Sequence, residues 1–199
     1  MKKRNVGRPR DGDPAETRRD ILRAAEESFA ASGFVGATTR QVAARAGVNV
    51  ATLHYHFGNK ERLYRAVLEA AVAGEVPGVP VAGSPAERLA GVVEAIWDFG
   101  WMRPALPRLS LLHRLAGPAY AEGRSHEPLD DPRAKLLSRT MALVSAKGAL
   151  PPEEAARFVL VLMDGALVAA RNGHGPDAPV PEAPRRAVVA AALRVTGLA

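Results

Sequence analysis

Residues 38–60, TTRQVAARAGVNVATLHYHFGNK, constrain the fold more than any other stretch of the sequence. Thr38, followed three residues later by Gln41, has the pattern of a capping box at the start of a helix. Gly47 is suited to end that helix in a left-handed turn, and Asn49 is suited to cap the next helix. The stretch therefore predicts two short helices joined by a tight turn, with a third helix directly after them.

The two short helices are each predicted to have one apolar and one polar face. Val42 and Ala46 are four residues apart, as are Leu53 and Phe57, so each pair lies on one inner face. The outward residues include no acid; they are Arg40, Thr52, His54, Tyr55 and His56. Two helices with a glycine-containing turn form the helix-turn-helix pattern, so we expect the outward face to enter a DNA major groove. The alternative is two ordinary helices of an all-α protein.

Residues 15–72 resemble the DNA-binding domain of a TetR-family transcriptional regulator. The resemblance is carried by the segments TRRDILRAAEESFAASGF, ATTRQVAARAGVNVATLHYHF and GNKERLY, and it covers about a third of the chain. The other two thirds match the family only in length and helical style. The resemblance implies an all-α fold, with an N-terminal three-helix helix-turn-helix DNA-binding domain and a C-terminal helical ligand-binding and dimerisation domain.

The resemblance also implies roles for individual residues. Arg40 would read a base edge, with guanine O6 and N7 as its partners. Phosphate would be bound by Thr38, and by Lys60 where the helix dipole favours an anion. The residues that would face bases at the start of the recognition helix are Val50, Ala51 and Thr52, and those that would contact the backbone or bases farther along are Tyr55 and His56.

His54 departs from the family pattern, which often has tyrosine at this place. A histidine can still bind phosphate, but its charge depends on pH near neutrality. His54 and His56 do not predict a metal site, because residues two apart on a helix lie about 200° apart around its axis. We therefore expect no metal in this domain.

The basic charge is confined to the first third of the chain. Residues 1–65 contain 13 Lys and Arg against 7 Asp and Glu, whereas residues 66–199 contain 14 of each. A basic module joined to a neutral one indicates a polyanion partner for the first and a different task for the second. A basic tail that serves only solubility is the alternative.

Residues 1–13, MKKRNVGRPRDGD, have no apolar periodicity and predict a basic arm that is disordered without a partner. Its segment GRPR resembles the core of an AT-hook, so we expect Arg8 and Arg10 to lie in a minor groove beside the helix-turn-helix. A tail that binds phosphates without specificity is the alternative. The arm would precede a DNA-binding domain at residues 14–73.

The proline- and glycine-rich segment 74–84, GEVPGVPVAGS, predicts a boundary before a second domain at residues 85–199. Five further helices are expected there, with no strand alternation. The stretch Phe158–Ala170 is apolar on nearly every side and must be covered all round. Together with the last helix it would form a four-helix interface around a two-fold axis, with Phe158, Leu162, Ala166, Val189 and Leu193 as the candidate residues. An internal helix of a monomer is the alternative.

A candidate ligand pocket is also expected in the second domain, because both tryptophans and most methionines fall there. Small-molecule pockets are mostly apolar with a few polar anchors. The candidate ligand-binding residues are Trp97, Trp101, Met102, Leu109, His113, Met141 and Met163, with His113 as the anchor. The alternative is that aromatic residues and methionines at helical spacing simply form the core.

The sequence also excludes several classes of function. It has no cysteine, and it contains no glycine-rich phosphate loop, nucleophile turn or metal-ligand spacing. We therefore expect no enzyme activity and no cofactor. No apolar stretch reaches the length of a membrane span, and no leader peptide is visible, so a cytoplasmic protein without a membrane partner is expected.

These observations predict a dimeric, ligand-responsive transcriptional regulator, a repressor released from its operator by a small apolar or amphipathic molecule. Its partners would be double-stranded operator DNA, a second copy of the chain and an unidentified small-molecule effector. The effector would move the helix that starts at Lys60 and change the spacing between the two recognition helices. An architectural DNA-binding protein without an effector ligand is the alternative.

Overall fold

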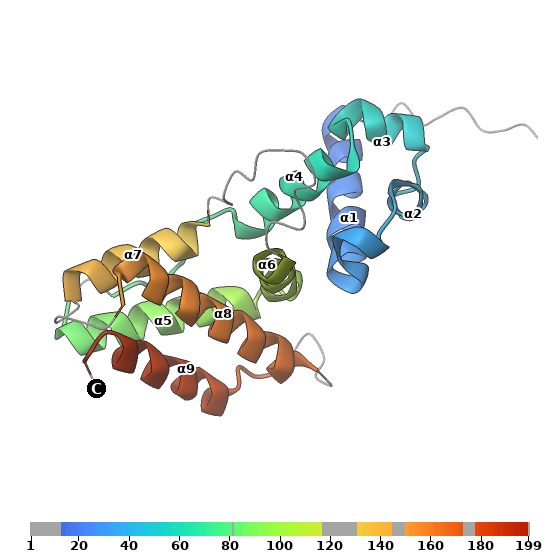
Figure 1. Ribbon diagram of the computed structural model, residues 1–199. Helices are drawn as coiled ribbons and strands as arrows, with labels where there is room; N and C mark the ends of the chain where they lie inside the picture. The colour runs from blue at the N-terminus through green and yellow to red at the C-terminus, as the bar shows by residue number, and fades with distance from the viewer. Residues whose placement is uncertain (1–12, 81, 117–130, 145–149, 173–177, 199) are drawn as a thin grey trace, which may run out of the picture. The chain divides into compact units, whose positions relative to one another are not determined.

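The structure, a computed structural model, describes residues 13–80, 82–116, 131–144, 150–172 and 178–198 (Figure 1). Over these residues it contains nine helices and no strand, which confirms the all-α fold. Arg8 and Arg10 lie outside the described residues. The helices are α1 (Pro14–Gly36), α2 (Thr39–Arg45), α3 (Val50–Phe57), α4 (Lys60–Val72), α5 (Pro85–Trp101), α6 (Ala105–Ala116), α7 (Pro132–Val144), α8 (Pro152–Arg171) and α9 (Glu182–Val195).

Contacts within the chain divide it into a first unit, Met1–Val67, and a second unit, Leu68–Ala199. This division falls inside α4, earlier than the segment 74–84 at which the sequence predicts a boundary. The predicted domain limits therefore stay a prediction. Among the described residues, no helix combines the length and the apolar character that crossing a membrane requires.

Helix α1 supports the first unit. The carboxylate of Asp13 accepts a hydrogen bond from the Ala15 backbone N–H at 2.9 Å, and Pro14 is the first helical residue. The helical path is interrupted at Gly33, where φ is +66°. Only glycine adopts this conformation without steric cost, so the regular helix ends at Gly33 and one more short turn follows it. The buried face of α1 meets α4 through the edge-to-face contact of Phe29 with Tyr64, whose ring centroids are 4.9 Å apart.

The predicted capping box and turn define α2 and α3. The Gln41 backbone N–H donates to Thr38 Oγ1 at 3.2 Å, and the Thr38 backbone N–H donates to Gln41 Oε1 at 3.0 Å. Gly47 has φ +70° between the helices. Asn49 Oδ1 then accepts from the Thr52 backbone N–H at 2.7 Å and caps α3. The inward residues Val42, Leu53 and Phe57 are buried.

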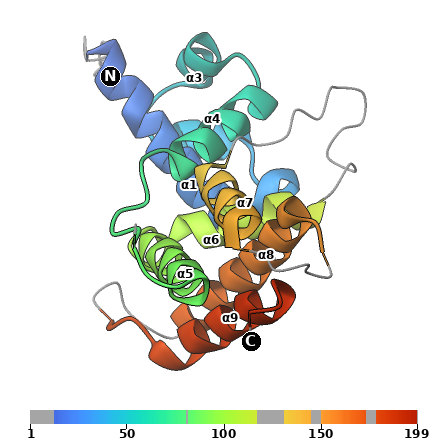
Figure 2. The same cartoon turned by 90° about the vertical axis from the view of Figure 1, so that its left-hand side faces the viewer.

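The second unit is organised around α8, which packs against α5, α6, α7 and α9 (Figure 2). The described residues of this unit form the five helices α5 to α9, the number that the sequence predicts. Helix α5 approaches α8 closely at Gly100, where an added Cβ would lie 2.8 Å from Leu167 Cδ1. The apolar core includes Leu89, Val93, Ile96, Trp97, Trp101, Leu137, Met141, Val159, Leu160, Met163 and Val188.

A buried ionic network ties three helices of this unit together. The guanidinium of Arg133, at the start of α7, is fully buried. It donates to both carboxylate oxygens of Asp131, to Asp164 Oδ1 on α8 at 2.9 Å and to Ser110 Oγ on α6 at 2.9 Å. Arg114 on α6 donates to Asp131 Oδ2 at 2.7 Å. A buried charge is tolerated only with such partners, so the network holds α6, α7 and α8 in one arrangement.

The two carboxyl groups of the network respond differently to burial. Burial alone would raise the pKa of Asp131, but the charges and hydrogen bonds of Arg133 and Arg114 outweigh it and hold that pKa below its ordinary value. At Asp164 burial is the stronger effect and raises the pKa, although Arg133 opposes it. Asp131 is therefore the partner whose ionised form stabilises the fold.

The turn between α2 and α3 predicts a graded cost of substitution. Gly47→Ala should lower the free energy of unfolding by about 1 kcal/mol, because a residue with a Cβ is strained at positive φ. No atom lies within 4 Å of the added Cβ, so steric overlap contributes nothing. Gly47→Asn should lower the free energy of unfolding by less than Gly47→Ala does, since asparagine tolerates this conformation better. Urea denaturation followed by circular dichroism measures both, and equal losses in the two variants would contradict the assignment.

The Asp131 pairing predicts a pH-dependent contribution to stability. Asp131→Asn should lower the free energy of unfolding by about 2 kcal/mol at pH 7, the range of hydrogen bonds to charged groups. Because its pKa is lower in the folded chain, the contribution is complete above the unfolded pKa of about 4 and is lost as pH falls through the folded pKa. The difference in free energy of unfolding between wild type and Asp131→Asn should therefore become smaller at acidic pH.

The control for this measurement is Asp98→Asn, whose half-exposed carboxylate lies 3.4 Å from Arg185. Exposed pairs contribute about 0–1 kcal/mol, so this variant should stay close to wild type in chemical denaturation. If the difference in free energy of unfolding between wild type and Asp131→Asn does not depend on pH, the stabilising role of the ionised Asp131 is refuted.

Candidate nucleic-acid interface

The outward face of α3 carries the predicted DNA-reading residues together. Tyr55 is exposed over 85% of its surface. Ala51 and His54 are also exposed, whereas Val50, Thr52 and His56 are half-buried. The rings of Tyr55 and His56 meet edge to face, with centroids 5.3 Å apart. Helix α3 contains no acidic residue. Its outward face therefore suits an anionic partner that contains stacked rings.

The arginines of the first unit divide into two groups by their partners. Arg45 forms an ion pair with Glu27 at 3.2 Å and joins α2 to α1. The guanidinium of Arg18 lies 5.1 Å from the ring centroid of Phe57 and joins α1 to α3. Arg40, by contrast, is exposed on α2 and forms no ion pair with any described residue. Its guanidinium is therefore available to a partner outside the chain.

Two predicted DNA contacts have capping roles inside the protein. Thr38 Oγ1 donates its proton to Gln41 Oε1 at 2.9 Å, and Thr52 Oγ1 donates to Asn49 Oδ1 at 3.1 Å. A hydroxyl has one proton to donate, so each must give up this bond before it can donate to phosphate. Their first task in the structure is to hold the ends of α2 and α3.

His54 also has an internal partner. Its Nδ1 is hydrogen-bonded to the backbone carbonyl of Gly58, where α3 ends. Because a carbonyl only accepts, Nδ1 carries the proton, and Nε2 is the nitrogen that remains for another contact. The imidazole therefore caps the recognition helix at its C-terminal end, a role that the sequence analysis did not predict.

Lys60 connects the start of α4 to the turn after α1. Its Nζ lies 3.5 Å from the Val35 carbonyl oxygen and 4.4 Å from the ring centroid of Phe34. Burial lowers the pKa of Lys60, and the neighbouring Glu61 opposes this effect. An ammonium has three donors, so a phosphate contact in addition to the internal ones is chemically feasible.

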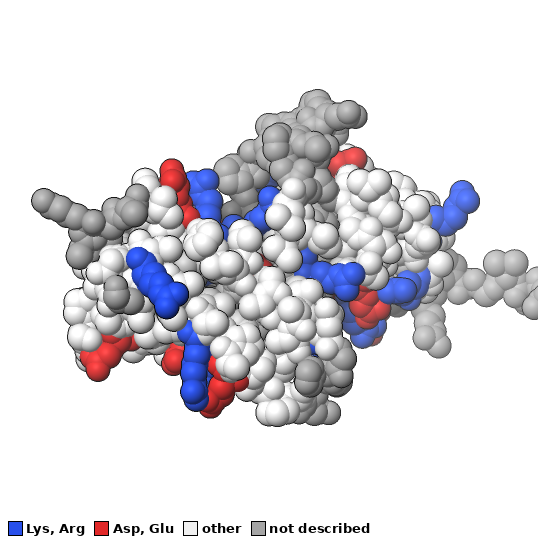
Figure 3. Space-filling model, turned by 60° about the horizontal axis from the view of Figure 1, so that its bottom comes forward, with Lys and Arg blue, Asp and Glu red and all other residues white. Residues whose placement is uncertain are grey.

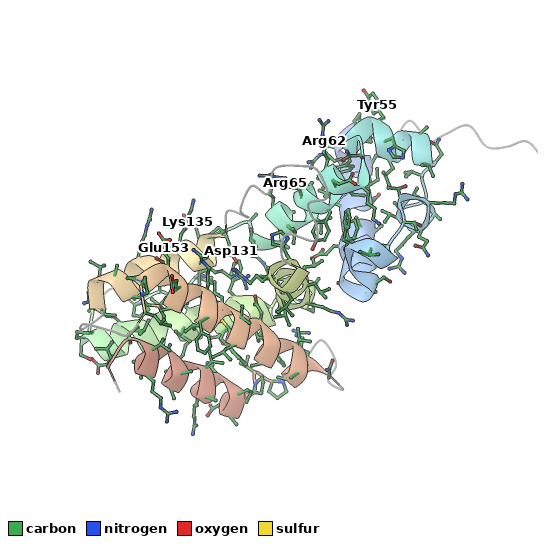
Figure 4. All side chains as sticks on the ribbon, in the orientation of Figure 1. Tyr55, Arg62, Arg65, Asp131, Lys135 and Glu153 are labelled. Atoms are coloured by element: carbon green, nitrogen blue, oxygen red, sulfur yellow. The ribbon has the colours of Figure 1, made fainter. Side chains whose placement is uncertain are left out.

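Sequence reasoning missed two exposed arginines on α4, Arg62 and Arg65. Figure 4 shows their side chains along the same edge of the first unit as Tyr55. Arg62 stands next to the cap of α4, where its backbone N–H donates to Asn59 Oδ1 at 2.9 Å. Their spacing of three residues, opposite the buried Leu63, is the signal in the sequence that would have found them.

Most of the predicted ligand-pocket residues lie in the core of the second unit. Trp97, Trp101, Met141 and Met163 belong to one buried apolar cluster. Met102 does not join them, because it follows the end of α5 and is 78% exposed. Leu109 is buried and His113 is half-buried, both on α6. The indole Nε1 of Trp97 has no hydrogen-bond partner among the described residues.

The predicted dimer residues form an apolar surface on α8 and α9. Phe158 is 46% exposed and Leu162 38%, although both are large apolar side chains. Ala166 follows them on α8 and is half-buried, as are Val189 and Leu193 on α9. Helices α8 and α9 pack against each other, so these residues belong to a helix pair that leaves apolar surface uncovered in the single chain.

Comparison with known proteins places this arrangement in a family. Residues 21–67 match the family model described as bacterial regulatory proteins, tetR family. The chain is 39% identical over 104 residues to the HTH-type transcriptional activator FasR of Mycolicibacterium smegmatis, over 49% of this chain and 48% of FasR. It thus spans about half the length of that relative.

A second relative aligns over more of the chain. The HTH-type transcriptional repressor AcnR of Corynebacterium glutamicum is 28% identical over 155 residues, which cover 76% of this chain and 80% of AcnR. Both relatives are named as regulators of transcription, which are not enzymes.

Solved structures share the fold of the chain. A TetR-like transcriptional regulator from Rhodococcus sp. RHA1 superposes with a TM-score of 0.60 at 18% identity, over 89% of this chain and 94% of the other. HlyIIR, a hemolysin II transcriptional regulator, gives a TM-score of 0.58 at 18% identity, over 92% and 99% of the two chains. With its capped helix-turn-helix and its helical second unit, the chain has the DNA-binding domain of the TetR family at residues 21–67 and shares its fold with solved TetR-like regulators.

Proposed function

We propose that this regulator is a dimeric repressor that reads an operator sequence and is released from it by a small-molecule effector. The observation that carries the proposal is the acid-free outward face of α3, with the exposed Tyr55, together with the exposed Arg40 on α2. A rigid reading face of this kind suits recognition of base edges better than uniform coating of DNA.

The DNA contacts divide into those that read and those that position. Arg40 reads a base edge, and Val50 and Ala51 offer apolar contact to a thymine methyl group. The exposed Arg62 and Arg65 on α4 bind phosphates together with Lys60. Phosphate contacts fix the register of the protein on the duplex without carrying sequence information.

Dimerisation places two recognition helices on successive turns of the operator. The uncovered apolar surface of α8 and α9, which includes Phe158 and Leu162, supports a second copy of the chain as the occupant. A two-fold interface repeats the same surface on both chains. Half-sites one helical turn apart then suit a near-palindromic operator.

Repression and release by an effector complete the proposal. The relatives named as repressors include AcnR, SCO4008 of Streptomyces coelicolor and NicS of Pseudomonas putida. FasR is named as an activator, so the sign of regulation varies among relatives. Helix α4 runs from the first unit into the second. An effector bound in the second unit would act through α4 and change the spacing between the two recognition helices of the dimer.

Two arginine variants distinguish reading from positioning. Arg40→Ala should weaken binding to the operator by about 1–3 kcal/mol while leaving binding to random duplex nearly unchanged. Arg62→Ala should weaken both alike and reduce by about one the slope of log affinity against log salt. The measurement is fluorescence anisotropy of labelled DNA from upstream of the gene, with random duplex as competitor.

The same titration tests the alternative function. The titration is repeated with a pool of DNA fragments that covers the genome. If the wild-type protein binds all fragments equally well, and Arg40→Ala does too, the protein is architectural and the proposal fails. A genomic pool is used because the operator need not lie beside the protein's own gene.

The proposed dimer predicts a second contrast between variants. Leu162→Glu should convert the protein to a monomer in analytical ultracentrifugation, because it places a charge at the centre of a buried interface. Leu143→Glu is the matched control: Leu143 is an exposed leucine of the same unit, on α7. Dimers in both variants, with unchanged circular dichroism, would rule out this surface as the interface.

A further inference from the structure

A groove lies on the surface of the second unit between α7 and α8. Its volume is about 330 Å³, and its lining residues are Ala134, Lys135, Ser138 and Arg139 from α7 and Glu153 and Arg157 from α8. Figure 4 shows Lys135 and Glu153 at this place, with Asp131 nearby. The groove belongs to neither the reading face nor the apolar surface of α8 and α9.

The lining of the groove has an excess of positive charge. Three cationic side chains face one acid, and that acid, Glu153, is 3.7 Å from Arg157 in an exposed pair. Arg139 is exposed and pairs with no acid among the described residues. One carboxylate balances only one of the three cations, so Glu153 leaves an excess of positive charge among the lining residues.

The nearest buried acid does not compensate this charge. Asp131 is already paired with Arg133 and Arg114, and α7 itself contains no Asp or Glu. On the face that Figure 3 draws, lysines and arginines stand among acids and uncharged surface. Residues 66–199 are balanced in charge as a whole, so the excess in the groove is local.

The side chains of the groove match the chemistry of a small anion. Lys135 and Arg139 are four residues apart on α7, with the hydroxyl of Ser138 on the same side. Ammonium, guanidinium and hydroxyl groups donate hydrogen bonds to carboxylate or phosphate oxygens. The volume is within the range of small-molecule sites.

We propose that the groove between α7 and α8 binds a small metabolite anion carrying carboxylate or phosphate groups, with Arg139, Lys135 and Arg157 as its cationic ligands. Such an anion joins α7 to α8 at the surface, whereas the buried Arg133 joins the same helices inside. The role of this groove as an effector site rests on the proposed regulatory function. The binding of the anion to the groove does not depend on that function.

Isothermal titration calorimetry of the full chain tests the site with two probes, inorganic pyrophosphate and succinate, at constant ionic strength set by NaCl. We expect saturable binding of at least one probe with one site per chain, and the probe that binds identifies phosphate or carboxylate as the preferred group. Arg139→Gln should weaken this binding by about tenfold or more, because it removes a charged donor. The matched control is Arg108→Gln, an exposed arginine of the same unit on α6.

Two results would overturn the proposal: no saturable binding of either probe, or equal binding by Arg139→Gln and Arg108→Gln. Circular dichroism of both variants establishes that they are folded. The DNA titration is carried out separately without either probe. A protein that binds its operator but neither anion therefore loses the groove site and keeps its regulatory function.

Discussion

The outward face of α2 and α3 depends on the hydrogen bonds that cap these two helices. Both helices are too short to be stable in isolation. Helices of seven and eight residues leave most of their terminal backbone groups without helical partners. Thr38, Gln41 and Asn49 satisfy the amino-terminal groups, and the imidazole of His54 pairs with the Gly58 carbonyl at the end of α3. The outward orientation of Tyr55 and Arg40 follows from these local hydrogen bonds and from the packing of Leu53.

Sequence reasoning predicted the parts of this structure that depend on neighbours in the chain. Caps, glycine turns and apolar spacing act over three or four residues, so the helices and the two reading helices follow from local pattern. The Arg133–Asp164 pair joins residues 31 apart, and no local pattern indicates it. The same limit explains His54: its place on an outward face suggested phosphate, whereas its bond to Gly58 depends on how the helix ends.

Charge has two separate tasks in the two units. In the first unit, Arg18 and Arg45 are used to hold helices together, and Arg40 is left for a partner. In the second, Arg133 and Arg114 are neutralised inside the fold by Asp131 and Asp164, and the cations of α7 stay at the surface. A balance of charge over the whole unit therefore conceals a buried network and a basic groove.

The position of the two indoles has a spectroscopic consequence. Trp97 and Trp101 are the only tryptophans of the chain, and both are buried in the second unit. The indole of Trp101 donates to the Ala178 carbonyl at 3.2 Å, and the guanidinium of Arg171 lies 4.5 Å from its ring centroid. Emission excited at the red edge of protein absorption thus reports the second unit alone, because the first unit contains no tryptophan. The chain therefore carries a label-free optical probe of its second unit.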